Sequence, residues 1–299
     1  MNNVNAAILQ LDHWIAEHAA PEAYQWFAQQ CQHLAQEQSA PLQERHLVKA
    51  MGLAARKLGK ADMHLSQADL AQAHALRPGF DPSGWSLDQT ARVAFILASF
   101  HADEVQFAAC LERLAESAEI NELIALYCGF ALYPAATIIE PRAREAIRSS
   151  MRPVFEAMAQ RNPYPMEQFD AASWNQMIVK TFFLDSPLWP IQGVDARANP
   201  DLAHILVDLA HERWAAGRAI SPELWRCVAL HADADGIAAL QRVLDTGSAP
   251  EKIAVALAFK PCPDSPLRAR CEQDGLNAVA TGYTWPRLMQ DWAGIAKIN

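Results

Sequence analysis

Large polar residues lie close to aromatic residues in one stretch of this chain, residues 162–218, whereas small and apolar residues at helical spacing dominate elsewhere. Amides and charged groups beside an aromatic ring suit a small polar ligand, because they supply hydrogen bonds and a flat apolar surface. We therefore expect a polar pocket in this stretch. The candidate binding residues are Asn162, Tyr164, Trp174, Asn175, Gln176, Asp195, Arg197, Asn199, Arg213 and Trp214.

His211, Lys180 and Glu212 are the candidates for catalytic chemistry. Histidine side chains titrate near neutrality, so His211 is the natural acid–base group. Lys180 falls in a predicted helix, residues 173–184, that is apolar on both sides, and a buried lysine needs an acidic partner or a lowered pKa. The alternative is a lysine that extends along a hydrophobic edge to solvent. We expect Lys180 and His211 to face one pocket, because their two helices are expected to be neighbours.

Arg213 falls on the apolar face of a second predicted helix, residues 200–217. A charge on that face must be paired, so we expect Arg213 to be buried against Asp195, Glu212 or an acidic ligand. Asp195 also alternates with Arg197 in the preceding loop, where an ion pair between them would anchor the loop without any ligand.

His204, Asp208 and His211 share one side of the same predicted helix. Imidazole and carboxylate groups one turn apart can bind a metal ion. However, a polar strip on an amphipathic helix is ordinarily solvated, so we expect no metal site. The sequence contains no Walker loop, dinucleotide fingerprint or G-x-S-x-G motif, and we expect no cofactor.

Asn162-Pro163-Tyr164-Pro165 is expected to be a rigid extended segment. Each proline fixes its own φ and disfavours helix at the preceding residue. Such a segment would hold Tyr164 in one direction, either as a plug of the core or as the wall of a ligand site.

Composition and charge exclude several classes of protein. The formal charge of −9 over 299 residues argues against nucleic acid as a partner, which requires a concentrated basic face. The six cysteines lack C-x2-C spacing and are expected to be reduced thiols. Apolar runs are shorter than the roughly 20 residues that span a bilayer, and no secretory signal is visible. We expect a cytoplasmic protein without a transmembrane segment.

Periodicity predicts an all-α protein, an irregular α-α superhelix of antiparallel helix pairs, with no alternating strand runs. Prolines at first-turn positions and Ser66 as an N-cap mark the predicted helix starts, and one helix is predicted over residues 267–281. Residues 77–86, RPGFDPSGWS, contain two prolines and two glycines and are expected to be a linker. The predicted domains are therefore residues 1–76 and residues 87–299.

Long runs between residues 84 and 259 carry a resemblance: FEAMAQRNPYP, FDAASWNQM, PLWPIQGVDARAN, LAHERWAAGR and SPELWR. They resemble the EboA-type proteins, a family named after the ebo gene clusters of bacteria and some algae. In those clusters the family accompanies prenyltransferase-like and sugar-isomerase-like proteins, among others. In cyanobacteria the clusters are associated with export of a sunscreen precursor.

The resemblance implies a role in specialised metabolism, with residues 87–299 as the EboA-like domain and other pathway proteins as possible partners. The ligand would be a small polar intermediate, such as a cyclitol, a sugar-like compound or a phenol. No catalytic residue is carried over, so the chain is either an enzyme or binder for that intermediate, or a non-catalytic helical scaffold or carrier.

Overall fold

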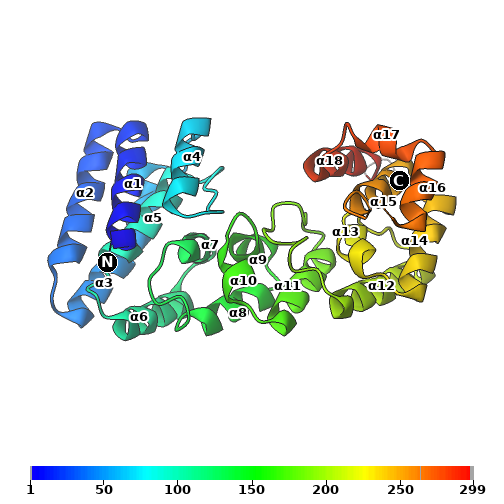
Figure 1. Ribbon diagram of the computed structural model, residues 1–299. Helices are drawn as coiled ribbons and strands as arrows, with labels where there is room; N and C mark the ends of the chain where they lie inside the picture. Colours follow the sequence, from blue (N-terminus) through cyan, green and yellow to red (C-terminus); the bar gives the residue numbers. More distant parts are fainter. Residues whose placement is uncertain (1, 263, 297–299) are drawn as a thin grey trace. The chain divides into compact units, whose positions relative to one another are not determined.

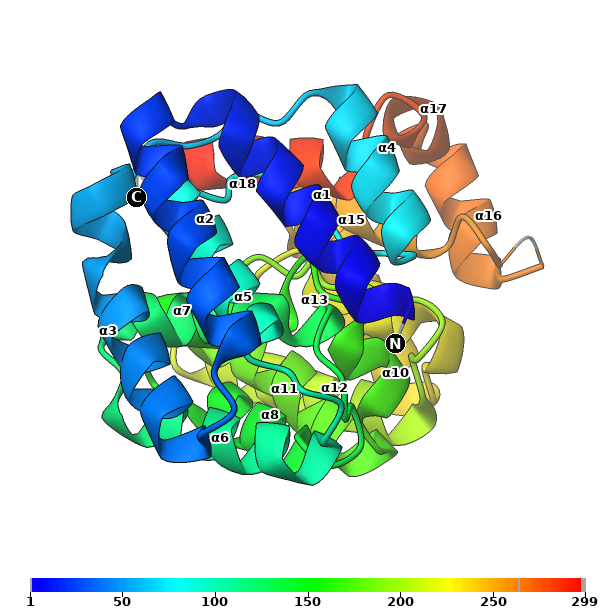
Figure 2. The same ribbon diagram turned by 90° about the vertical axis from the view of Figure 1, so that its left-hand side faces the viewer.

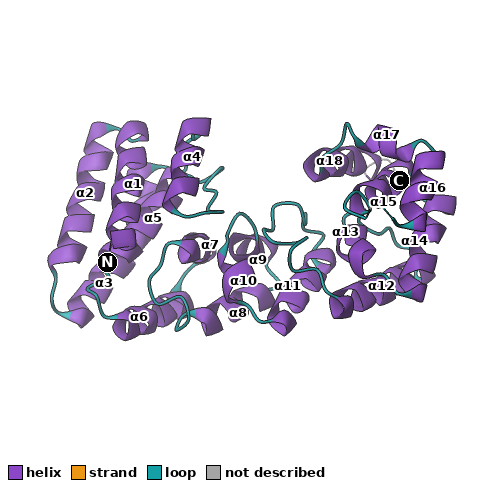
Figure 3. Ribbon diagram, in the orientation of Figure 1, coloured by secondary structure: helices purple, strands orange, loops and turns teal. Residues whose placement is uncertain are grey.

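The computed structural model describes residues 2–262 and 264–296, and every regular element in them is a helix (Figures 1 and 3). Strand pairing in these ranges is limited to one isolated bridge between Asp62 and Ser86. The all-α prediction is therefore confirmed, whereas the superhelical arrangement stays a prediction. None of the described helices is both long and apolar enough to cross a membrane.

The chain divides into two compact units, Met1–Asp170 and Ala171–Asn299. The 77–86 segment contains no helix, as expected, and lies inside the first unit. The predicted division into domains of residues 1–76 and 87–299 stays a prediction. The helices of the first unit are α1 (Asn2–His18), α2 (Pro21–Gln36), α3 (Ala40–Leu58), α4 (Gln67–Leu76), α5 (Leu87–Ala98), α6 (Glu104–Ser117), α7 (Ile120–Cys128), η1 (Gly129–Ala131), α8 (Glu140–Arg148), α9 (Arg152–Ala159) and α10 (Tyr164–Gln168).

Helix α5 is the centre of the first unit. It is buried along almost its whole length, and α1, α2, α3 and α7 pack around it (Figures 1 and 2). Its sequence LDQTARVAFILA is apolar on more than one side, which is typical of a helix with neighbours all round. The residues before and after the 77–86 segment thus contribute to one core.

The second unit is built around α15, which packs against α13, α14, α17 and α18. Gly275, with φ 72°, separates α16 from α17, so the single helix predicted over residues 267–281 is wrong. A left-handed glycine ends a helix without steric cost. The helices of this unit are α11 (Ala171–Phe183), α12 (Pro200–Ala215), α13 (Leu224–Val228), η2 (Ala229–His231), α14 (Ala234–Thr246), α15 (Ala249–Ala258), α16 (Pro266–Gln273), α17 (Leu276–Ala280) and α18 (Trp285–Ala296).

The Asn162–Pro165 segment is not extended, so that prediction is wrong. Pro163 has helical backbone angles, and Tyr164 and Pro165 form the first turn of α10. The side-chain oxygen of Asn162 accepts a hydrogen bond from the Tyr164 N–H at 3.0 Å. A proline in a first helical turn gives up no hydrogen bond, because N–H groups there have no intrahelical partner.

The buried Gly129 and the exposed Gly52 provide a matched test of how closely the core is packed around Gly129. A Cβ at Gly129 would lie 2.2 Å from the hydroxyl oxygen of the buried Tyr133, whereas at Gly52 it would have Glu122 as its nearest neighbour, at 3.6 Å. We expect Gly129→Ala to lower the free energy of unfolding by about 1–3 kcal/mol through overpacking. Gly52→Ala, inside α3, should raise it by about 0.5–1 kcal/mol. Urea unfolding of both variants measures the two signs, and a Gly129→Ala protein as stable as the parent would contradict the close packing.

Candidate functional site

A pocket of about 300 Å³ with many polar lining residues lies in the first unit, and we call it the polar pocket. Its walls come from the 81–85 turn, from α5 and α7, and from α9 with the three residues that follow the helix end. The lining residues are Asp81, Ser83, Gly84, Trp85, Gln89, Ile124, Cys128, Pro153, Glu156, Ala157, Gln160, Arg161 and Asn162. Of the predicted site residues, Asn162 is in this set.

Local backbone geometry forms the rim of the polar pocket. Gly84 has φ 81°, a conformation that L side chains rarely adopt, and Arg161 has φ 53° although it carries a side chain. The Asp81 N–H donates to the Arg161 carbonyl at 3.3 Å, and the two side chains form an ion pair at 3.4 Å. These contacts hold Arg161 in its left-handed conformation. Strained residues of this kind cluster at ligand sites.

Asn162 and Tyr164 join the polar pocket to the core. The Asn162 amide donates to the Tyr127 carbonyl at 3.3 Å, so the side chain is fixed in a buried position. The Tyr164 hydroxyl donates to the Ala136 carbonyl, and its ring meets Phe130 edge-on with centroids 5.2 Å apart. Tyr164 is therefore placed as a plug of the core, one of the two alternatives that the sequence allowed.

The chemistry of the polar pocket suits recognition of a ligand. Amides of Gln89, Gln160 and Asn162 both donate and accept hydrogen bonds. No histidine is among the lining residues. Burial raises the pKa of Cys128 to about 12, so its thiol stays protonated at neutral pH and is not an activated nucleophile.

The predicted residues at the start of α11 and α12 form two structural pairs. Asn175 and Asn199 exchange hydrogen bonds of 3.2 and 2.8 Å, and the Asn199 side chain also caps α12 by accepting the Leu202 N–H at 2.9 Å. The Arg197 guanidinium lies 4.7 Å from the ring centroid of the buried Trp174, a cation–π contact. These pairs fix the beginning of α12 against α11.

Asp195 pairs with neither Arg197 nor Arg213, contrary to expectation. Its carboxylate accepts two hydrogen bonds from Arg226, at 2.6 and 2.7 Å. The geometry is bidentate, which the planar guanidinium favours. Arg226 is 31 positions further along the chain, so sequence spacing gave no indication of it.

Arg213 is half-buried, with 21% of its side chain exposed, and so is less buried than predicted. It donates to the carbonyls of Phe182 at 2.7 Å and Ala219 at 3.3 Å. The nearest carboxylate is that of Asp185, at 4.0 Å and 83% exposed. The α12 face predicted to be apolar is partly open, since Ile205 is 41% exposed, and this explains why a charge is tolerated there.

The remaining predicted residues lie near the surface of the second unit. Gln176 and Glu212 are exposed, and Lys180 is half-buried. His211 has its Nε2 3.3 Å from the Asp235 carboxylate and meets Trp214 edge-on. Trp214 in turn stacks on Trp225, and the Arg242 guanidinium lies 4.1 Å from the centroid of the Trp214 ring. Catalytic roles for His211, Lys180 and Glu212 stay predictions.

The histidines of α12 do not assemble a metal-binding group. His204 lies 3.7 Å from Asp208 and 3.9 Å from Asp233, whereas His211 contacts Asp235 instead. Within residues 2–262 and 264–296, no three histidine, cysteine, aspartate or glutamate side chains are placed to hold a metal ion.

Glu223 is a buried acid that the sequence analysis missed. It is 0% exposed, and one carboxylate oxygen accepts the Leu188 N–H at 2.8 Å, while the other has no hydrogen-bond partner in the described part of the chain. Burial raises its pKa to about 7, against the opposing effects of the Leu188 N–H and of Arg226. The apolar residues around it in SPELWRCVAL were the signal in the sequence that could have indicated its burial.

The helical fold and the polar pocket together describe an all-α protein with a candidate site for a small molecule. The chain belongs to the EboA family, since the family model described as metabolite traffic protein EboA matches residues 7–229, more than half of the chain. The match includes most of residues 1–76, where the resemblance did not reach, and it ends before residue 259. No curated protein and no solved structure matched the chain.

Proposed function

We propose that this protein binds a small polar metabolite in the polar pocket and carries it between the proteins of its pathway. The observation that supports this proposal is the set of groups around one cavity of about 300 Å³: three amides, a hydroxyl, an Asp–Arg ion pair and an indole. Amides and hydroxyls hydrogen-bond the hydroxyl groups of a polyol, and an indole packs against its C–H face.

A cyclitol or another sugar-like compound fits this chemistry best. The lining offers many hydrogen-bond donors and acceptors, and its charged side chains Asp81 and Arg161 are paired with each other. A neutral, hydroxyl-rich ligand can hydrogen-bond to the lining without leaving either charge unpaired. The family description, which names metabolite traffic, agrees with binding and transfer.

Transfer is favoured over transformation by the same lining. Acid–base catalysis needs a group that exchanges protons near neutral pH, and nucleophilic catalysis needs an activated nucleophile. The polar pocket has no histidine, and its cysteine is a protonated thiol. Its two carboxylates are held in ion pairs, Asp81 with Arg161 and Glu156 with Arg152. We therefore propose that the ligand leaves unchanged, and that other proteins of the pathway supply and receive it.

Calorimetric titration of the protein with a panel of cyclitols and sugars, starting with myo-inositol, tests binding. Gln160 lines the polar pocket, whereas Gln168 in α10 does not. We expect Gln160→Leu to weaken binding about 2- to 12-fold, as the loss of one hydrogen bond worth about 0.5–1.5 kcal/mol predicts. Gln168→Leu should bind like the parent.

Two results would count against the proposal. If no member of the panel binds, or if Gln160→Leu and Gln168→Leu bind equally well, the polar pocket is not the site. If a bound compound is consumed when its NMR spectrum is followed over time, the protein is an enzyme and not a carrier.

A further inference from the structure

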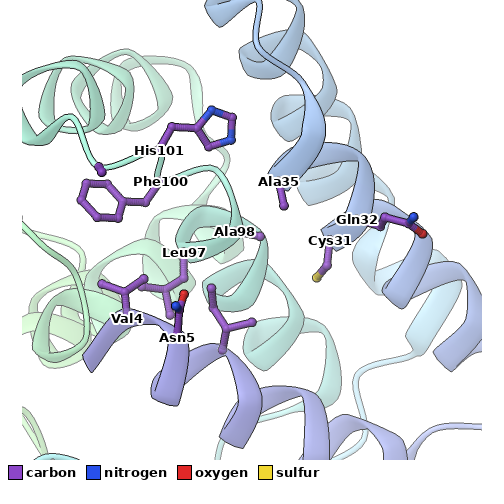
Figure 4. A pocket seen from close by; sticks show the side chains of 11 residues that line it. Val4, Asn5, Cys31, Gln32, Ala35, Leu97, Ala98, Phe100 and His101 are labelled. Atoms are coloured by element: carbon purple, nitrogen blue, oxygen red, sulfur yellow. The ribbon is translucent and has the colours of Figure 1, made fainter. Parts of the chain in front are cut away.

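A second pocket in the first unit has a different chemical character, and we call it the apolar pocket. It has a volume of about 500 Å³ and lies between α1, α2 and the end of α5 (Figure 4). Val4, Asn5 and Ile8 come from α1, and Cys31, Gln32 and Ala35 from α2. Leu97 and Ala98 end α5, and Phe100, His101 and Ala102 follow it.

The apolar pocket has a buried apolar floor and a polar rim. Leu97 and Ala98 are buried, whereas Asn5, Gln32 and His101 are exposed. Figure 4 shows Cys31 reaching from α2 toward the space between the helices, with Leu97 on the other side. An apolar floor with a few polar groups at the mouth is the usual form of a site for an organic molecule, and a volume of about 500 Å³ is within the usual range.

The apolar pocket differs from the polar pocket in the charge of its lining residues. None of its lining residues is an aspartate, a glutamate, a lysine or an arginine. Burial, with the nearby Asp12 carboxylate, raises the pKa of the Cys31 thiol well above its usual range, so Cys31 remains neutral. An ion in this pocket would lose its hydration without gaining a partner of opposite charge, which is costly.

His101 is held at the rim by α2 and α3. Its Nε2 lies 3.0 Å from the Gln43 amide nitrogen and 3.2 Å from the Leu34 carbonyl oxygen, and the Gln43 amide also donates to Leu34 at 2.8 Å. These contacts fix the imidazole beside the mouth. A ligand with one hydroxyl or carbonyl group could therefore find Asn5, Gln32 or His101 at the rim while its apolar part occupies the floor.

We propose that the apolar pocket is a second ligand site, which binds a neutral, mainly apolar small molecule with one hydrogen-bonding group. This site is independent of the polar pocket and shares no lining residue with it. The proposal therefore does not rest on the binding of a polar metabolite, and the two can succeed or fail separately.

Titration with N-phenyl-1-naphthylamine, a neutral probe that fluoresces in apolar surroundings, tests the site. We expect one probe to bind per chain. 1-Naphthalenemethanol should displace it at least tenfold more effectively than 1-naphthoate, which has the same rings but a negative charge. Equal displacement by the two compounds would overturn the assignment of a neutral ligand.

Variants at exposed positions locate the probe. Ala35→Trp and Gln32→Trp place an indole at the mouth of the apolar pocket, whereas Gln29→Trp changes an exposed residue of α2 outside its lining. Both mouth variants should weaken probe binding at least tenfold, and Gln29→Trp should bind like the parent. Circular dichroism confirms that each variant is folded. If the probe does not bind the parent, or if both mouth variants bind it like the parent, the proposal is wrong.

Discussion

Arg92→Leu is expected to lower the free energy of unfolding by about 3–5 kcal/mol, because it leaves a buried carboxylate without its partner. Arg92 and Asp88 lie one turn apart in α5, and each side chain is 5% exposed. Arg92 also donates to the Met51 carbonyl at 3.1 Å, and the Ser86 hydroxyl donates to Asp88 at 2.6 Å. Urea unfolding of the variant and the parent measures the loss.

Two further variants separate the ion pair from simple packing. Asp88→Leu combined with Arg92→Leu removes both charges, so the double variant should be more stable than Arg92→Leu alone. Arg213→Ala provides a control, since Arg213 is half-buried and has only an exposed carboxylate nearby. Its loss should cost about 1–2 kcal/mol through missing hydrogen bonds to carbonyls. If Arg92→Leu costs no more than Arg213→Ala, the Asp88–Arg92 pair is solvated in solution.

Glu223→Gln should remove a dependence of stability on pH that we expect of the parent between pH 4 and pH 8. The folded-state pKa of Glu223 is raised from 4.5 to about 7. The folded protein therefore binds the proton more tightly than the unfolded chain does. The stabilising contribution of the neutral carboxyl is complete below pH 4.5 and is lost as the pH rises through 7, by about 3 kcal/mol in all.

The measurement compares free energies of unfolding in urea at pH 4, 6 and 8. Glu223→Gln should gain about 3 kcal/mol relative to the parent from the lowest to the highest pH. Glu212→Gln, which replaces an exposed carboxylate in α12, should keep a constant difference from the parent. A constant difference for Glu223→Gln as well would mean that the Glu223 carboxyl has the same affinity for protons in the folded and unfolded states.

Helix positions followed from short-range chemistry and were largely predictable. Pro21 begins α2, Ser66 caps α4 through a reciprocal capping box with Asp69, and Asn199 caps α12. These signals act within three or four residues, so they are visible in the sequence. Where the prediction failed, as at Gly275 and at Asn162–Pro165, a residue could take two backbone conformations, and the surrounding structure selected one.

The candidate site could be predicted only in part. Asn162 was identified because amides beside prolines and aromatics stand out in the sequence, and it lines the polar pocket. Gln89 and Gln160 were not identified, because each falls in an ordinary helical pattern. They line the same pocket only because α5, α7 and α9 pack together. Periodicity shows which residues share a face, but it does not show which element covers that face.

The sequence by itself determined the all-α class, the main helix starts and membership of the EboA family. Tertiary structure alone decided that Asp195 pairs with Arg226, that Glu223 is buried, and that Arg161 adopts a left-handed conformation beside Asp81. Helix formation depends on residues within one turn, whereas ion pairs, burial and pockets depend on segments that are distant in the chain and meet only when the core is packed.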